Sequence, residues 1–158
     1  MTKFAHLKSK IREIMRFPTP GVNFKDITPL LEDKDTFREI IDGLHAAFIN
    51  VAVDKVLGID ARGFLLASAI AYLRGVGMVI VRKKGKLPCE TIVREHDLEY
   101  GRGTLEIHVD AVKKGARVLI IDDVLATGGT AEAAVHLVEA LGGKVVGIGF
   151  LIELPLGG

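Results

Sequence analysis

Residues 118–131 read VLIIDDVLATGGTA and bring together two kinds of groups that can take part in chemistry. Two adjacent carboxylates, Asp122 and Asp123, end a run of apolar residues. The segment 126–130, which reads ATGGT, combines two glycines with two threonines just before a helix-like pattern begins. Glycines let the backbone approach an anion closely, and the start of a helix presents unpaired N–H groups. The segment therefore predicts a phosphate cradle.

The two carboxylates would repel a phosphate unless they face a different part of the ligand. Sugar hydroxyls donate hydrogen bonds and suit carboxylates, and so does the hydration shell of magnesium. Together the two features predict a site for a phosphorylated ribose. The alternative is structural: Asp122 and Asp123 would only cap a loop, and the glycines would only form a turn.

Two other nucleotide-binding patterns are excluded. An ATP-binding P-loop requires G-x-x-x-x-G-K-[ST], and a dinucleotide-binding turn requires G-x-G-x-x-G after a strand. The sequence contains neither pattern in the required place.

The composition predicts one soluble globular domain. The chain has 158 residues, of which 49% are hydrophobic and 26% charged, and its formal net charge is +1. This charge argues against nucleic-acid binding, and no apolar run approaches the ~20 residues of a membrane span. The single cysteine excludes an internal disulfide framework and fits a reducing compartment, so we expect a cytoplasmic protein. The five scattered histidines do not predict a zinc site.

Alternating apolar strands and helices predict a parallel sheet covered on both faces. The predicted helices are residues 2–16, 37–48, 62–75 and 130–143, and the predicted strands are 55–60, 76–82, 116–123 and 144–154, with 17–24 irregular. Ligands bind beyond the carboxyl ends of the strands in such sheets. The polar clusters 60–63, 82–84 and 122–123 fall at those ends, so they should converge on one rim.

The segment 83–103 interrupts the alternation. It is polar and about twenty residues long, where connections usually take about two to six. Because it follows a strand that ends at the predicted rim, we interpret it as a flexible lid; the alternative is a disordered surface excursion. Residues 104–109, TLEIHV, alternate strictly between apolar and polar types and predict a half-exposed strand.

The stretch 118–131 resembles the ribose-phosphate signature of the type I phosphoribosyltransferase family. Four further segments resemble, in order, matching segments of the adenine phosphoribosyltransferases: FPTPGVNFKDITPLL (17–31), GIDARGF (58–64), VRKKGKLP (81–88) and LEYGRGTLEIH (98–108). The resemblance covers nearly the whole chain. It implies the α/β type I phosphoribosyltransferase fold in a single domain, 1–158, with a mostly parallel twisted sheet flanked by helices, a hood over about 1–34 and the lid over about 83–103.

The resemblance also implies an enzyme, a pentosyltransferase of purine salvage. Adenine and phosphoribosyl pyrophosphate would give AMP and diphosphate, with Mg²⁺ required and a homodimer expected. Arg62 would neutralise the leaving group, and Glu99 would transfer a proton on the purine. The family pattern also places a cis peptide bond at Asp60–Ala61.

The remaining roles are implied residue by residue. Ala126, Thr127, Gly128, Gly129 and Thr130 would bind the 5′-phosphate, and Asp122 and Asp123 the ribose hydroxyls and, through the substrate, magnesium. The pyrophosphate would contact Asp60, Ala61, Arg62, Gly63, Arg82, Lys83 and Lys86, and the adenine Asn23, Phe24 and Lys25.

Alternatives remain open at this stage. The chain could act on hypoxanthine, guanine or xanthine, or it could be a non-catalytic ligand sensor of the same fold. Phe24 could belong to a core, and the lysines could form a solvated basic face. The sequence departs from the family pattern at Cys89 and His96, and relatives usually continue beyond the final LIELPLGG.

Overall fold

The computed structural model describes residues 4–98 and 101–154. The chain divides into two compact units, Met1–Gly43 and Leu44–Gly158. Within the described ranges, no helix is both long enough and apolar enough to cross a membrane.

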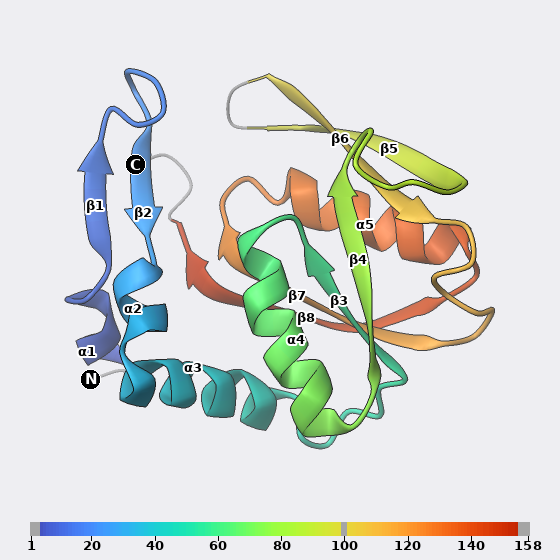
Figure 1. Ribbon diagram of the computed structural model, residues 1–158, viewed down its shortest axis with the longest axis horizontal. Helices are drawn as coiled ribbons and strands as arrows, with labels where there is room; N and C mark the ends of the chain where they lie inside the picture. Colours follow the sequence, from blue (N-terminus) through green and yellow to red (C-terminus); the bar gives the residue numbers. More distant parts are fainter. Residues whose placement is uncertain (1–3, 99–100, 155–158) are drawn as a thin grey trace. The chain divides into compact units, whose positions relative to one another are not determined.

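The first unit contains a small hairpin (Figure 1). The elements are α1 (Ala5–Lys8), β1 (Arg12–Met15), β2 (Asn23–Asp26), α2 (Thr28–Glu32) and most of α3 (Lys34–Ala47). Strands β1 and β2 pair antiparallel, with Ile14 opposite Phe24. The helix predicted over 2–16 is wrong, because only its first part is helical and Ile14 lies in a strand. The apolar residues at helical spacing belong first to a short helix and then to a hairpin. Cross-strand pairing stabilises the hairpin.

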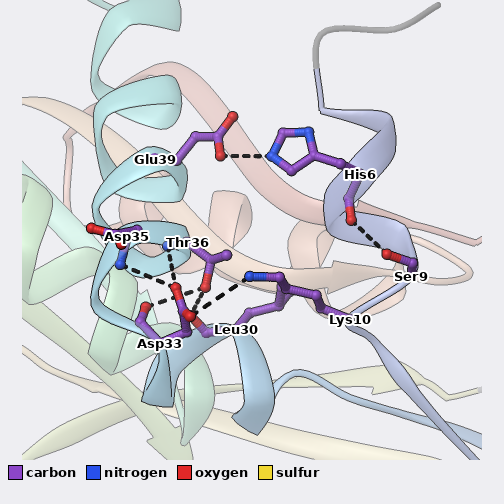
Figure 2. A network of polar contacts seen from close by, with 8 residues as sticks. All are labelled: His6, Ser9, Lys10, Leu30, Asp33, Asp35, Thr36 and Glu39. Carbon is purple, nitrogen blue, oxygen red and sulfur yellow. Dashed lines mark hydrogen bonds and ion pairs between the residues drawn. The ribbon is translucent and has the colours of Figure 1, made fainter.

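A polar network connects α1 with α3 inside this unit (Figure 2). Asp33 Oδ1 accepts hydrogen bonds from the backbone N–H groups of Asp35 and Thr36, at 3.1 and 2.8 Å, and so caps the start of α3. The bond from Thr36 is the main reason that the pKa of Asp33 is lowered. His6 Nε2 lies 2.8 Å from Glu39 Oε2, which joins α1 to the middle of α3.

The second unit carries the sheet. Its elements are β3 (Lys55–Ile59), α4 (Arg62–Arg74), β4 (Gly77–Lys83), β5 (Thr91–Asp97), β6 (Arg102–His108), β7 (Arg117–Leu125), α5 (Gly129–Ala140) and β8 (Lys144–Glu153). The described residues of this unit form a six-stranded sheet in the order β5-β6-β4-β3-β7-β8. Strands β4, β3, β7 and β8 are parallel, whereas β6 pairs antiparallel with both β4 and β5. The predicted α/β fold is confirmed.

Helices cover both faces of the parallel strands. Leu57 and Ile59 of β3 belong to the main core, which includes Leu137 of α5. Gly58, between them, points to the opposite face, where an added Cβ would lie 2.8 Å from the Cβ of Ala67 in α4. Because successive residues of a strand face opposite sides, α4 and α5 lie on different faces of the sheet. Gly75 ends α4 in the left-handed conformation, as the sequence predicted.

The segment 83–103 is more regular than expected. It contains β5, which pairs with β6 from Thr91 opposite His108 to Asp97 opposite Arg102. The hairpin lies beside α5, against which β5 packs (Figure 1). The strand predicted over 104–109 is present as part of β6, but its predicted half-exposure is wrong, because Glu106 is buried between the buried Leu105 and Ile107. A charged residue in an alternating pattern therefore faces inward here.

Candidate active site

Residues that are distant in the sequence meet at the carboxyl ends of β3, β4 and β7. Arg62 Nε, at the start of α4, lies 2.7 Å from Asp123 Oδ2. Arg82 Nε, near the end of β4, lies 3.3 Å from Asp60 Oδ2. Gly63 lies directly beside Asp122, since an added Cβ would be 2.6 Å from Asp122 Oδ1. The predicted convergence of the three polar clusters on one rim is therefore confirmed.

The segment 60–63 turns directly from β3 into α4. The Asp60-Ala61 peptide bond is cis, where the resemblance placed it. Ala61 is the residue that precedes the first turn of α4, and Arg62 is the first residue of the helix. This brief connection places a guanidinium beside two carboxylates that belong to another strand.

Asp122 and Asp123 lie side by side in the buried part of β7, 8% and 6% exposed. Burial, followed by the charge of Asp123, raises the pKa of Asp122 to about 7, and the nearby Arg62 opposes that rise. Asp123 Oδ2 is buried, and its ion pair with Arg62 lacks hydrogen-bond geometry. Asp123 Oδ2 can therefore accept a hydrogen bond from a ligand that displaces the Arg62 guanidinium.

The carboxylate pair also suits magnesium, which prefers oxygen ligands and keeps most of its waters. No group of three or more His, Cys, Asp or Glu side chains gathers as a metal site in ranges 4–98 and 101–154. Asp122 and Asp123 thus offer oxygen atoms of the kind that magnesium prefers.

We expect Asp122→Asn to make the ligand-free protein more stable at neutral and alkaline pH. The native pKa of Asp122 lies above its unfolded value of 3.8, so the native state binds more protons between these two pH values. The free energy of unfolding of the parent should therefore fall as the pH rises from about 4 to 7, by about 2–4 kcal/mol, and stay lower above pH 7. Asp122→Asn should not show this fall in the free energy of unfolding, because asparagine does not ionise.

Urea unfolding at pH 4, 6 and 8 measures the difference in free energy of unfolding between the parent and Asp122→Asn. The two proteins should be similarly stable at pH 4 and should diverge at pH 8. Identical pH profiles for parent and variant would contradict the raised pKa.

The segment 126–130 connects β7 to α5 as a compact turn. Gly128 is left-handed, with φ of 89°, and its carbonyl accepts the bond from Glu132 N that starts the helix. The backbone N–H groups at this helix start have no earlier turn to bond, which suits a phosphate. Gly129 has another neighbour: an added Cβ would lie 2.3 Å from the backbone oxygen of Asp97. The end of β5 therefore lies directly against the predicted cradle.

The basic residues stand at the end of β4 and in the turn that follows. Lys83 and Lys86 are exposed, and Arg82 Nη1 donates to the backbone oxygen of Lys86 at 3.1 Å. Arg82 thus links this turn to Asp60. The sequence did not reveal that Glu106 also bonds to this turn, because its position in an alternating strand predicted exposure.

The predicted base-binding residues belong to β2 of the first unit. Phe24 packs edge-on against Phe17, with ring centroids 5.4 Å apart and an interplanar angle of 73°. Lys25 Nζ forms an ion pair with Glu13, and Asn23 is exposed. Phe17 was not among the predicted residues, although an aromatic pair close in sequence is a usable signal. Glu99 lies outside the described residues.

Comparisons with known proteins show which family this chain belongs to. The family described as "Phosphoribosyl transferase domain" matches residues 25–156. The adenine phosphoribosyltransferase of Solibacter usitatus is 57% identical over 148 residues, which are 94% of this chain and 86% of that protein. This chain belongs to the adenine phosphoribosyltransferase family. It is accordingly an enzyme of the pentosyltransferase class with the type I phosphoribosyltransferase fold.

Solved structures of adenine phosphoribosyltransferases share the fold closely. The enzyme of Thermoanaerobacter pseudethanolicus is 52% identical with a TM-score of 0.90, over 94% of this chain and 86% of that one. The enzyme of Saccharomyces cerevisiae, in complex with adenine and D-2,5-dideoxy-2,5-imino-altritol 1,6-bisphosphate, is 38% identical with a TM-score of 0.86. That similarity covers 94% of this chain and 87% of the yeast chain.

Proposed function

We propose that this chain converts adenine and phosphoribosyl pyrophosphate to AMP and diphosphate, a step of purine salvage. Family membership supports the reaction, and the yeast relative is described with adenine bound. One observation of this chain carries the proposal furthest: Arg62, Asp123 and Asp122 meet beside Gly63 at one end of the sheet. That arrangement suits a ligand with a diol and a negatively charged leaving group.

The ribose-phosphate half of the ligand is assigned to β7 and the turn after it. The backbone of 126–130 binds the 5′-phosphate, with Thr127 and Thr130 as additional donors. Asp122 and Asp123 accept hydrogen bonds from the ribose hydroxyls. These contacts fix the anomeric carbon against the incoming base, which converts a bimolecular reaction into an oriented one.

The pyrophosphate half is assigned to the ends of β3 and β4. Arg62 leaves Asp123 and binds the departing oxygens, while Arg82, Lys83 and Lys86 add positive charge and 60–63 supplies backbone donors. Bond breaking leaves positive charge on the ribose, as in other glycosyl transfers, so stabilising the leaving group lowers the barrier. Asp122 and Asp123 would hold magnesium together with the substrate, and the ion would supply further charge neutralisation for the leaving group.

Base binding and proton transfer are assigned to the two remaining segments. Phe24 stacks on adenine, and the backbones of Asn23 and Lys25 read its edge. Glu99 takes the proton that the purine loses as N9 attacks. Residues 1–158 act as one domain in this proposal, with 1–34 as the hood and 83–103 as the lid. The lone free cysteine, exposed Cys89, supports a cytoplasmic location.

The deciding experiment is AMP formation from adenine and phosphoribosyl pyrophosphate with and without magnesium. A panel of hypoxanthine, guanine and xanthine at the same concentrations tests base choice. We expect turnover with adenine only, and only with magnesium. Faster turnover with another purine would contradict the adenine assignment, and binding of the ribosyl substrate without turnover would favour a ligand sensor.

We also propose a homodimer that forms through α4. Leu65 and Tyr72 lie seven residues apart on this helix, thus on the same side, and are 49% and 87% exposed. Leu73 is 48% exposed, so three exposed apolar side chains lie on the outer surface of α4, with the exposed Ser68 between them. Exposed apolar surfaces of this kind are usually covered by a partner, and a second copy of the chain offers the same surface.

We expect Leu65→Glu/Tyr72→Glu to dissociate this dimer, because charges would be buried between the two copies of α4. Sedimentation at micromolar concentration should show about twice 17.1 kDa for the parent and 17.1 kDa for the variant. Ile49→Glu, at an exposed apolar residue outside α4, is the matched control and should stay dimeric. A parent that sediments as a 17.1 kDa species would contradict the proposal.

A further inference from the structure

Glu106 is a buried carboxylate that the proposed reaction does not use. It is 4% exposed and lies in β6, between Leu105 and Ile107. Burying a carboxylate is costly unless it is well hydrogen-bonded. The burial of this carboxylate therefore requires hydrogen-bond donors close to it.

Its partners are backbone N–H groups of the turn after β4. Glu106 Oε1 accepts from the N–H groups of Lys86 and Leu87, at 2.7 and 2.8 Å. Burial acts to raise the pKa of Glu106, but the bonds from Leu87, Gly85 and Lys86 outweigh it, and the pKa is lowered. The carboxylate is thus ionised at neutral pH and fills a hollow of converging N–H groups.

The turn needs this anchor because of its conformation. Gly85 is left-handed, with φ of 86°, and an added Cβ would meet nothing within 4 Å. Residues 83–86 are all exposed, so side-chain packing does little to fix the turn. The carboxylate of Glu106 fixes it from inside, through successive backbone donors.

Lys86 is fixed from both sides of its backbone. Its N–H donates to Glu106, and its carbonyl accepts from Arg82, which in turn pairs with Asp60. On its other oxygen, Glu106 accepts a long bond from Thr91 of β5, at 3.4 Å. The carboxylate therefore joins the end of β4, the basic turn and the β5–β6 hairpin.

We infer that Glu106 is a positioning residue that orients the 84–87 turn and thereby directs Lys86 toward the pyrophosphate group. This inference rests on the proposed function, which assigns Lys86 to pyrophosphate. Glu106 does not itself contact the substrate in this proposal, and its negative charge is stabilised locally by the backbone donors. Its effect should therefore appear in pyrophosphate binding and spare the 5′-phosphate cradle.

The test compares Glu106→Leu, Glu106→Gln, Lys86→Ala and the double variant Glu106→Leu/Lys86→Ala. Glutamine can still accept the two N–H bonds through its oxygen, whereas leucine leaves these donors without an acceptor. The readouts are inhibition by pyrophosphate, KM for phosphoribosyl pyrophosphate and the Kd of ribose 5-phosphate. Far-UV circular dichroism and thermal unfolding establish that each variant is folded.

We expect Glu106→Leu to weaken pyrophosphate inhibition about tenfold or more, with the Kd of ribose 5-phosphate within about twofold of the parent. Glu106→Gln should stay close to the parent. The double variant should bind pyrophosphate no worse than Lys86→Ala alone, because both changes act through the same lysine.

Two results would overturn the inference. If Lys86→Ala weakens pyrophosphate binding and folded Glu106→Leu does not, Glu106 is not a positioning residue, and the role of Lys86 stands. If Lys86→Ala has no effect, the pyrophosphate role proposed for Lys86 fails, and the inference fails with it.

Gly85→Ala keeps the test decisive if Glu106→Leu does not fold. It strains the same turn without any clash, because the space around Gly85 is open. It should weaken pyrophosphate inhibition in the same way and leave ribose 5-phosphate binding unchanged. Unchanged pyrophosphate inhibition in this variant would also overturn the inference.

Discussion

Glu99→Gln is expected to lower kcat by about 10²–10⁴-fold while the affinity for phosphoribosyl pyrophosphate is retained, because general acid–base catalysis contributes a factor of this size. Glutamine keeps the size of the side chain and removes its ability to take a proton. Steady-state kcat and KM for both substrates, together with pyrophosphate inhibition, measure the effect. Glu95→Gln is the matched control, because Glu95 is an exposed carboxylate of β5 that is four residues away in the sequence.

The kinetic pattern distinguishes three roles of Glu99. A fall in kcat alone indicates proton transfer in the transition state. A rise in KM and weaker pyrophosphate inhibition, together with lower kcat, would indicate that Glu99 orders the lid by pairing with Arg62. A kcat within about threefold of the parent contradicts the proton-transfer role, since that role requires about a hundredfold or more.

The double variant Asp122→Asn/Asp123→Asn should lose tenfold or more in kcat/KM. In the proposed reaction, the carboxylates accept charge-assisted hydrogen bonds from the ribose hydroxyls, worth about 1.5–3 kcal/mol against about 1 kcal/mol for neutral ones. The variant also removes the ion pair that holds Arg62 in the free protein. Initial rates at several concentrations of phosphoribosyl pyrophosphate and magnesium measure the loss.

Asp110→Asn is the control for this experiment, because Asp110 is exposed in the turn after β6 and has no assigned role. It should match the parent in all kinetic constants. Parental kcat/KM in the double variant would mean that Asp122 and Asp123 are structural. If Asp122→Asn alone gains stability and loses activity, the Asp122 carboxylate is kept at a cost to folding.

The parallel part of the sheet could be predicted from the sequence because strands buried on both faces read as continuous apolar runs. The runs that end at Ile59 and Asp123 are of this kind, and both proved to be strands with polar residues at the rim. The left-handed end of α4 at Gly75 was equally readable, since few residues other than glycine adopt that conformation.

The sequence-based predictions that were wrong share a physical origin in contacts between strands and distant segments. Ile14 fits a helical period, but its position opposite Phe24 in a hairpin decides its structure. The strand β5 lies at the edge of the sheet with much of its surface exposed, so it lacks an apolar run. Glu106 is charged yet buried, because its partners are backbone groups from a turn about twenty residues earlier, which no local pattern reveals.

The contact between Gly129 and the backbone oxygen of Asp97 has a consequence for mutational scanning. The Asp97 side chain is 88% exposed, so most substitutions there leave the oxygen in place. At Gly129, by contrast, every other residue brings a Cβ to within 2.3 Å of that oxygen. A saturation library should therefore record position 97 as permissive and position 129 as restrictive, although the two residues form one contact. Tolerance at a position reports on its side chain, and a contact made by the main chain is visible only from the residue opposite.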